Sequence, residues 1–455
     1  MHGIIPPFLL QRLTEHADET VAASSRKTLL TDAVLRQERI GRPPRSAATR
    51  DVRGARATTG PRRTIADAKN TTTLPGTTVR NEGDPPTGDL AADQAYDGLG
   101  LTWTMLFEAF GRDSLDGAGM PLLATVHYGE RYDNAFWNGE RMVFGDGDGE
   151  VFGSFTGAVD VIGHELAHGL IQSTVNLEYQ DQPGALNESI ADVIGTLTKQ
   201  HALGQTAEQA DWLIGVGLFT DKVQGEALRS MKAPGTAYDD DVLGKDPQVA
   251  RMDDYVETSE DNGGVHINSG IPNYAFYLAA TAIGGNAWES AGQIWIDVLT
   301  NNAVDTTADF AQFAAATIAA AAARFGEDSA ERRAVADAWQ QVGVAPSTTP
   351  APTPPSDDPA SETVTVQRSG GLLGRTQTGT LPESALPSAE QRQLNSLIDS
   401  GELQQLQQER AMPDAYVWRV QVETRIDVTL NEPALPGDVL QLFQRILDLG
   451  DNRPR

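Results

Sequence analysis

Apolar residues near the N-terminus recur at the three- to four-residue spacing of an amphipathic helix. The spacing covers residues 8–40, and the predicted apolar face consists of Leu9, Leu13, Ala17, Val21, Leu29, Leu30, Val34 and Leu35. The pattern ends at Arg42-Pro43-Pro44-Arg45, and residues 41–63 are rich in Arg, Ala, Thr and Gly, which is typical of an exposed linker. We therefore expect residues 1–63 to form an N-terminal leader that consists of a helical part and a linker.

Short β-like runs follow the leader. A helix is predicted for residues 96–110, and two runs at residues 124–128 and 141–144 then alternate with glycine turns. Runs this short, bounded by glycine, are typical of strands and not of helices. We expect residues 64–158 to form a β-rich lobe.

Helical spacing dominates the chain from Val159 onward. It is almost continuous through the Ala-rich residues 311–323 to residues 339–344. Residues 159–345 are therefore predicted to form a helical lobe. Together the two lobes predict an α+β fold.

The composition changes again in the C-terminal part of the chain. Residues 346–362 contain six prolines among Ser, Thr and Asp and have no core-forming residues, which predicts an extended linker. Residues 363–455 then have the pattern of a small α/β module. Its predicted strands are residues 363–367 and 416–423, and its predicted helices are residues 388–409 and 437–449.

Charge and cysteine content narrow the functional classes. The chain has a formal net charge of −28, but residues 1–70 hold 13 Lys/Arg against 7 Asp/Glu, whereas the remainder holds 22 against 56. The strongly acidic charge of the chain after residue 70 argues against nucleic acid as a partner. The basic leader favours intramolecular docking, although a solvated leader without a partner fits the charge equally well. Because there is no cysteine and no apolar run of 18 residues, we expect neither disulfides nor a membrane span.

The most specific motif is His164-Glu165-Leu166-Ala167-His168, which lies on a helical apolar pattern. Histidines four residues apart share one face of a helix, so both imidazoles can reach one metal ion. Glu165 points toward the same cavity and can take a proton from a water that the metal activates. Glu188 offers a third ligand on a second helix, and two histidines, one glutamate and an open position are typical of catalytic zinc. These residues predict a metallopeptidase.

Several motifs together resemble those of the thermolysin family of neutral metalloendopeptidases. They lie at residues 134–138, 145–149, 164–168, 179, 187–192, 228–231 and 260–270. The leader is most similar to the protealysin branch, because it carries Pro6-Pro7 and lacks the basic start of a secretory signal. That branch implies a short propeptide whose Pro-Pro motif packs on the catalytic domain. An ordinary N-terminal helical extension is the alternative.

The resemblance implies a zinc site with defined roles. The Zn²⁺ ligands are His164, His168 and Glu188. Glu165 is the general base, and the second imidazole nitrogens of the ligand histidines meet Asp192 and Asn187. Tyr179 and His266 stabilise the oxyanion, and Asp261 orients His266.

The resemblance also implies a substrate cleft. Arg229 binds a substrate carbonyl through its planar donor fork. Asn134 and Ala135 pair with the substrate backbone as with an added strand. The pocket for the side chain after the scissile bond is walled by Phe152, Phe155, Val161 and Leu228. An apolar wall favours Leu, Phe or Ile at that position.

One departure from the family concerns calcium. Thermolysin has a double calcium site, and the matching positions keep only Asp160 and Asp211. Further acids are replaced by Lys199, Leu213 and Val216. Calcium needs six to eight oxygen ligands. We therefore expect the double calcium site to be absent and the lysine to pair with the two aspartates.

The C-terminal module resembles emfourin, a protein inhibitor of protealysin-like enzymes. The similarity rests on residues 364–371 and 429–433, and a generic binding module is the alternative. We predict a zinc-dependent neutral endopeptidase, made as a zymogen that cuts itself within residues 41–63, with an inhibitory C-terminal module. A catalytically restrained zinc protein with a protein-binding tail is the competing hypothesis, and an aminopeptidase is a third.

The expected partners and the cellular location follow from the composition and the family resemblance together. The expected partners are protein and peptide substrates and, within the same chain, the propeptide and the C-terminal module. We expect a monomer that binds neither nucleic acid nor membrane. We also expect secretion without a classical signal peptide, with a cytoplasmic location as the alternative.

Overall fold

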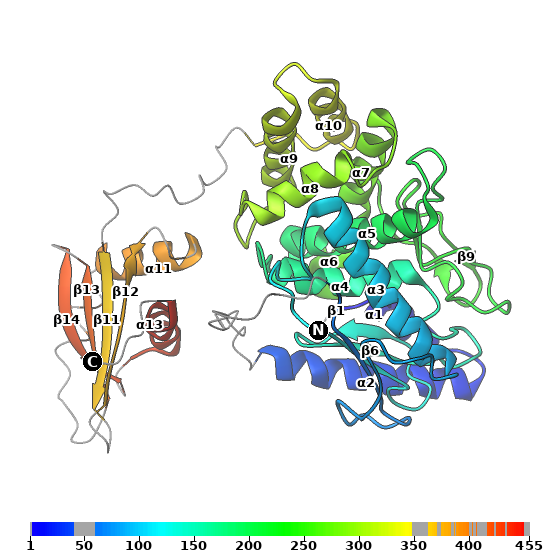
Figure 1. Cartoon of the computed structure of the whole chain (residues 1–455), viewed down its shortest axis with the longest axis horizontal. Coiled ribbons are helices and arrows are strands. Elements are labelled where there is room, and N and C mark those ends of the chain that lie inside the picture. The colour runs from blue at the N-terminus through cyan, green and yellow to red at the C-terminus, as the bar shows by residue number, and fades with distance from the viewer. Residues whose placement is uncertain are drawn as a thin grey trace. The chain divides into compact units, whose positions relative to one another are not determined.

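The computed structural model of the chain describes residues 2–40 and 60–347 and most of the C-terminal module (Figure 1). Within the module it describes residues 363–370, 375–383, 386, 388–399, 403, 406, 416–422, 425–432 and 435–449. The predicted linkers therefore lie largely outside the described residues. The chain divides into two compact units, Met1–Ala351 and Pro352–Arg455.

A mixed six-stranded sheet forms the β-rich lobe. Its strand order is β1-β5-β6-β4-β2-β3, and β2·β4 and β4·β6 are the parallel pairs. The strands are β1 (His2–Gly3), β2 (Arg63–Asp67), β3 (Thr77–Asn81), β4 (Leu122–Val126), β5 (Ala135–Trp137) and β6 (Met142–Phe144). The predicted β-rich lobe is confirmed, and α3 (Leu90–Phe110) packs on the sheet but begins six residues before the predicted helix. The edge strand β1 comes from the start of the leader.

The leader forms two helices, α1 (Pro7–Leu13) and α2 (Glu19–Ile40), so the prediction of one helix over residues 8–40 is wrong. Pro7 stands at the first position of α1, where its missing N–H costs nothing and its φ suits a helix. Between the helices, the Asp18 side chain accepts a hydrogen bond from the N–H of Thr20 at 2.8 Å. This contact satisfies a backbone donor at the start of α2.

The predicted apolar face of the leader is correct only in part. Leu9, Leu13 and Val21 are buried and Leu29 packs partly buried on the core, but Ala17 is exposed and Leu30 and Val34 are 70% and 56% exposed. The side chain of Leu35 lies outside the described residues. Among the described side chains of α2 beyond Ala22, the fully buried ones are polar, namely Ser24, Ser25, Thr28 and Asp32. They face a polar part of the β-rich lobe, which apolar periodicity cannot reveal.

Seven helices and four short strands make up the second lobe of the described chain. The helices are α4 (Val159–Gln172), α5 (Asp181–Leu203), α6 (Asp261–Asn268), α7 (Gly270–Ile283), α8 (Ala291–Thr300), α9 (Phe310–Phe325) and α10 (Ala330–Gln341). Between α5 and α6, the strands are β7 (Leu213–Ile214), β8 (Arg229–Ser230), β9 (Asp239–Asp240) and β10 (Gly244–Lys245), with a 3₁₀ turn at Met252–Asp254. The helical prediction is therefore wrong for residues 204–260, where turns and short hairpins replace it. No described helix combines the length and apolarity that a bilayer crossing requires.

Two glycines let α4 and α5 approach closely. A Cβ atom on Gly195 of α5 would lie 2.4 Å from the Asp160 carbonyl oxygen, and one on Gly163 of α4 would lie 2.9 Å from Thr198 Oγ1. Any larger residue would push the helices apart, because real Cβ contacts are longer. The close approach brings side chains of the two helices into one buried site.

The C-terminal module is a four-stranded antiparallel sheet with its described helices on one face (Figure 1). The strand order is β12-β11-β13-β14, with β11 (Thr363–Gly370), β12 (Arg375–Pro382), β13 (Val417–Val422) and β14 (Ile426–Asn431). The helices α11 (Ser388–Asp399) and α13 (Gly437–Leu449) cover an apolar core around Trp418 and Phe443. Sequence reasoning missed β12 and β14 as strands. The part of the predicted helix 388–409 beyond Asp399 lies largely outside the described residues.

Candidate metal centre and substrate cleft

Two histidines of α4 and one glutamate of α5 meet between the lobes. The ligand atoms of His164, His168 and Glu188 all lie within 4.8 Å of one another. His164 Nε2 is 3.4 Å from Glu188 Oε2, and His168 Nε2 is 3.6 Å from Glu188 Oε1. All three side chains are buried. The structure thus brings together the three residues predicted to hold zinc.

The polar atoms of this cluster fit a cation. The buried His164 Nε2 and Glu188 Oε2 make no hydrogen bond within the described part of the chain. Burial would raise the pKa of Glu188, but His266, His164 and His168 outweigh it and hold that pKa well below the ordinary value. The carboxylate is therefore ionised, and two imidazole nitrogens with one carboxylate oxygen are the donor set of catalytic zinc sites.

Asp192 and Asn187 of α5 orient the two histidines. His164 Nδ1 lies 2.8 Å from Asp192 Oδ1, and His168 Nδ1 lies 2.9 Å from Asn187 Oδ1. With Nδ1 engaged in this way, each ring presents Nε2 to the cluster. These are the two pairs that the resemblance implies.

Asp192 also binds two residues outside α4. Arg229 donates from Nε and Nη2 to its two oxygens, each at 2.8 Å, and Asn273 Nδ2 donates to Oδ2 at 2.8 Å. Although burial opposes ionisation, Arg229 and His164 lower the pKa of Asp192 to about 2. Sequence reasoning missed Asn273, which lies three residues beyond the matched motif at 260–270 and carries no local signal.

Glu165 lies beside the cluster and faces the β-rich lobe. Its Oε2 accepts a hydrogen bond from the Trp137 N–H of β5 at 2.9 Å, whereas its buried Oε1 makes none among the described residues. Burial raises the pKa of Glu165 to about 8, and His164 opposes the shift. A raised pKa near neutrality suits a residue that accepts and returns a proton.

Tyr179 and His266 flank the cluster on the opposite side. The Tyr179 hydroxyl is 3.4 Å from His266 Nε2 and donates to Glu188 Oε1. Asp261 accepts hydrogen bonds from the His266 backbone N–H at 2.9 Å and from Nδ1 at 2.7 Å. His266 lies on α6, in which residues 262–264 have left-handed backbone angles, and not in a glycine-rich loop. The structure brings these three predicted residues together.

The start of the leader runs through the predicted substrate cleft. His2 and Gly3 pair antiparallel with β5, and the Ile4 N–H donates to the Ala135 carbonyl at 3.1 Å. The Ile4 carbonyl accepts from Arg229 Nη1 at 3.2 Å, and the Ile5 N–H donates to Asn134 Oδ1 at 3.0 Å. The leader is therefore bound as an added strand by the residues predicted to bind substrate backbone.

The residues predicted to wall the pocket after the scissile bond are all buried. They belong, together with Ile4, to the large apolar core of the first compact unit, and they are Phe152, Phe155, Val161 and Leu228. The Phe152 and Phe155 rings are 5.9 Å apart. Ile4 itself has no exposed surface.

Polar contacts join α2 to the residues that precede β5. Asp32 accepts a hydrogen bond from Asn134 Nδ2 at 3.0 Å and another from the Tyr132 hydroxyl. Ser24 Oγ lies 2.9 Å from Asp133 Oδ2, and burial followed by the nearby Asp148 raises the pKa of Asp133 to about 8. The polar face of α2 thus matches the polar residues beside β5.

The predicted pairing of Lys199 with two aspartates is confirmed. Lys199 Nζ lies 3.0 Å from Asp160 Oδ2 and 2.9 Å from Asp211 Oδ1, and it donates to the Leu213 carbonyl at 2.7 Å. An ammonium group thus occupies the position between these carboxylates. Val216, by contrast, is 43% exposed.

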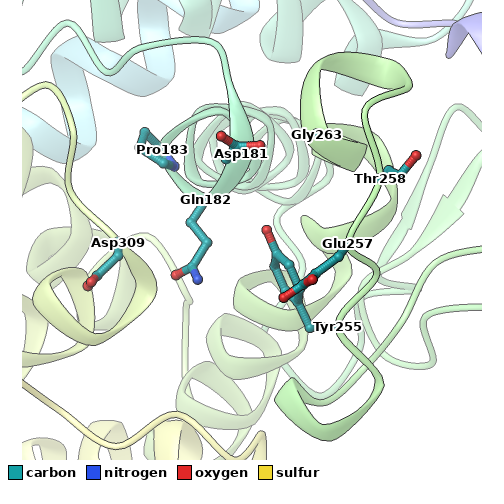
Figure 2. Close-up of a pocket in the computed structure, with 8 residues that line it drawn as sticks. All are labelled: Asp181, Gln182, Pro183, Tyr255, Glu257, Thr258, Gly263 and Asp309. Atoms are coloured by element: carbon teal, nitrogen blue, oxygen red, sulfur yellow. The ribbon is translucent and has the colours of Figure 1, made fainter.

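A second cavity, of about 400 Å³, opens at the start of α5 (Figure 2). Gln182 and Tyr255 point into it, and its carboxylates are Asp181, Glu257 and Asp309. The three residues of the candidate zinc site, His164, His168 and Glu188, do not line this cavity. It is therefore distinct from the metal centre.

A two-lobed α+β fold with a buried His-His-Glu cluster and an adjacent glutamate defines a metallopeptidase. The family profiles agree: the thermolysin metallopeptidase catalytic domain matches residues 49–172, and its alpha-helical domain matches residues 175–344. The emfourin profile matches residues 366–447. The chain belongs to the thermolysin family of metallopeptidases and carries an emfourin domain near its C-terminal end.

Relatives with similar sequences are bacterial proteases. The extracellular metalloprotease of Pectobacterium carotovorum subsp. carotovorum is 49% identical over 342 residues, 75% of this chain and 96% of that protein. Protease PrtS of Photorhabdus sp. is 47% identical over 344 residues, 75% of this chain and 92% of that protein. The structure of the precursor of protealysin, a metalloproteinase from Serratia proteamaculans, matches with a TM-score of 0.69 and 52% identity, over 76% of this chain and 100% of that one.

Proposed function

We propose that this protein is a zinc-dependent neutral endopeptidase that cuts peptide bonds before hydrophobic residues. The observation that carries the proposal is the buried cluster of His164, His168 and Glu188 with Glu165 beside it. The family resemblance assigns Phe152, Phe155, Val161 and Leu228 to the wall around the residue after the cut, and their buried apolar side chains support a preference for a hydrophobic residue there. Against a merely zinc-binding protein stand Glu165, Tyr179 and His266, none of which is needed to hold a metal.

We assign proton transfer, oxyanion stabilisation and substrate binding to separate residues of the chain. Bound zinc would polarise the attacking water and the substrate carbonyl. Glu165 accepts a proton from that water and delivers it to the leaving amine. Tyr179 and His266, with Asp261 behind His266, donate to the oxygen that gains negative charge. Substrate is held through Arg229, Asn134 and Ala135.

The leader supports a zymogen, in which residues 1–63 form the propeptide. Its first residues fill the cleft in the way a substrate would, and α2 binds the cleft residue Asn134 through Asp32. The peptidase lobes would then be residues 64–158 and 159–345. The double calcium site is proposed to be absent, because Lys199 supplies a fixed positive charge between Asp160 and Asp211.

We propose that residues 363–455, joined by the Pro-rich linker 346–362, restrain the peptidase of the same chain. The emfourin match over residues 366–447 supports an inhibitory module. A tether would keep the module at an effective concentration near the millimolar range. Binding of an outside partner is the alternative. The name of an extracellular relative supports secretion. A monomer that binds neither nucleic acid nor membrane stays part of the proposal.

Bond mapping tests the proposed activity. The full chain is loaded with Zn²⁺, left to mature and incubated with a mixture of peptides, and the new termini are read by mass spectrometry. We expect cuts before Leu, Phe and Ile that a zinc chelator abolishes. Cuts without such a preference, or cuts that survive complete zinc removal, would contradict the proposal.

A further inference from the structure

We infer that the Gly3–Ile4 peptide bond is the first bond that this enzyme cuts in its own maturation. The inference rests on the proposed peptidase function and adds to it a specific site of self-cleavage. It differs from the cut expected within residues 41–63, which would separate the leader from the peptidase. The argument starts from the register in which the leader lies in the cleft.

The backbone of Ile4 has the contacts of the first residue after a scissile bond. Its carbonyl accepts from Arg229, the residue proposed to bind a substrate carbonyl, and its N–H donates to the carbonyl of Ala135. Its side chain is fully buried in the apolar core that also contains the four residues proposed to wall the pocket after the cut. The next N–H, that of Ile5, is bound by Asn134. The bond that precedes Ile4 therefore lies where substrate is cut.

The other side of that bond faces the catalytic residues. Gly3 lines one small cavity together with Tyr179 and His266, the proposed donors to the oxyanion. Its neighbour His2 pairs with Trp137, whose N–H binds Glu165. Gly3 therefore lies in the part of the cleft that holds the proposed oxyanion donors, next to the strand whose Trp137 binds the proposed base.

The sequence of the leader disfavours the neighbouring registers. If the leader slid along β5 by one residue, Pro6 would take the place of Ile5, whose N–H binds Asn134. If it slid by two residues in the same direction, Pro6 would take the place of Ile4, whose N–H binds Ala135. Proline has no N–H to donate in either position. Sliding in the opposite direction by one residue would put Gly3 at the pocket, which it cannot fill. Pro6 and Ile4 together fix the Gly3–Ile4 bond in place.

Glycine is also the residue that this position accepts. A Cβ atom on Gly3 would lie 2.7 Å from Asn134 Nδ2. Asn134 cannot move away without loss, because its amide is held at one end by Ile5 and at the other by Asp32. The docked leader therefore requires a small residue immediately before the bond.

The reaction consumes one water molecule. The water oxygen bonds to the Gly3 carbonyl carbon, the bond from that carbon to the Ile4 nitrogen breaks, and Glu165 carries the water proton to that nitrogen. The products are an N-terminal fragment that ends at Gly3 with a new carboxylate and a chain that begins with the amine of Ile4. Cutting removes β1 but leaves Ile4 and Ile5 in the cleft, so release of the leader needs the later cut.

A zinc-triggered time course tests the inference. Full-length metal-free protein is supplied with Zn²⁺, and the leader fragments and hydrolysis of an added peptide are followed by mass spectrometry. We expect the fragment that ends at Gly3 and a leader beginning at Ile4 to appear before any cut in residues 41–63. A leader released with residues 1–3 still attached, while the added peptide is cut, would overturn the inference alone. Failure to cut either would overturn the proposed function as well.

Two variants separate the register from general damage to the leader. Ile4→Asp puts a carboxylate into the apolar pocket and should abolish the Gly3–Ile4 cut, whereas Ile4→Leu should retain it. Hydrogen exchange of the metal-free chains gives a readout without turnover: the N–H groups of residues 4 and 5 should be protected in wild type and Ile4→Leu and unprotected in Ile4→Asp. Equal cutting of both variants, or equal exchange, would contradict the register.

Discussion

Arg229 and Asp192 form a buried bidentate ion pair, with both hydrogen bonds at 2.8 Å, that connects the substrate cleft to the metal centre. Asp192 holds His164 through its Nδ1, while the remaining guanidinium nitrogen, Nη1, binds the carbonyl of Ile4. One side chain that contacts the bound peptide therefore also fixes a carboxylate that orients a zinc ligand. The ion pair therefore links β8, which carries Arg229, to α5, which carries Asp192.

The first prediction is that Arg229→Met destabilises the protein by about 3–5 kcal/mol, because it leaves the Asp192 carboxylate buried without its counter-ion. Arg324→Met is the matched control: Arg324 holds Asp297 in the same bidentate manner, but its side chain is 36% exposed. Exposed pairs contribute about 1 kcal/mol or less. Urea unfolding of both variants measures the difference, and equal losses would contradict the assignment.

The second prediction is that calcium adds little to stability. Lys199 places a fixed positive charge 3.0 Å from Asp160 and 2.9 Å from Asp211, which opposes binding of a divalent cation there. Melting temperatures should agree within about a degree between excess calcium and a calcium-selective chelator that spares zinc. A calcium-dependent rise of many degrees would show that a calcium site exists.

The third prediction concerns pH and the interface of α2. Burial and then Asp148 raise the pKa of Asp133 to about 8, and Ser24 and Thr28 of α2 contact this residue. Because the folded protein holds this proton more tightly than the unfolded chain does, the contribution of Asp133 to folding stability is fully present below the ordinary carboxyl pKa near 4. That contribution is lost as the pH rises through about 8. The docked leader should therefore weaken as the pH rises.

Asp133→Asn isolates this effect. The Asp133→Asn variant and the parent protein with which it is compared should both carry Glu165→Gln. This substitution keeps the leader uncut and removes a second carboxyl with a pKa near 8. Between pH 5 and 8.5 the parent should lose more than about 1 kcal/mol relative to the Asn variant, since one pKa unit corresponds to about 1.4 kcal/mol. Parallel stability curves would refute the role of Asp133.

The fourth prediction is that the C-terminal module lowers the turnover of the mature enzyme. A chain that ends at Ser347, within the first compact unit, should cut peptides faster than the uncut two-module chain. Adding the isolated module should slow the truncated enzyme, because emfourin-like modules are expected to bind the protease directly. Equal turnover by both chains and no response to the added module would rule out inhibition.

The sequence was most informative where the chemistry is local or the motif is long. His164 and His168 stand one helical turn apart, so their shared face follows from spacing alone. Placing Glu188 with them depended on the family resemblance, since only the packing of α5 on α4 through Gly163 and Gly195 brings that residue close.

The sequence was least informative where partners are distant and polar. The buried face of α2 is polar because it meets residues beside β5 about 100 positions away, so a search for apolar periodicity selected the exposed Leu30 and Val34 instead. Asn273 reaches Asp192 through the packing of α7 on α5, and no local pattern marks it. The register of the leader likewise required coordinates, although Pro6-Pro7 indicated that it docks.

The central claim is that Glu165 moves the proton while His164, His168 and Glu188 hold the metal. Glu165→Gln should therefore bind zinc like the wild type, measured by metal analysis of the purified protein, and lose peptide cleavage by a factor of about 10²–10⁴ or more. Glu208→Gln, an exposed carboxylate outside the cleft, is the control and should keep full activity. Wild-type turnover by folded, zinc-loaded Glu165→Gln would contradict the mechanism.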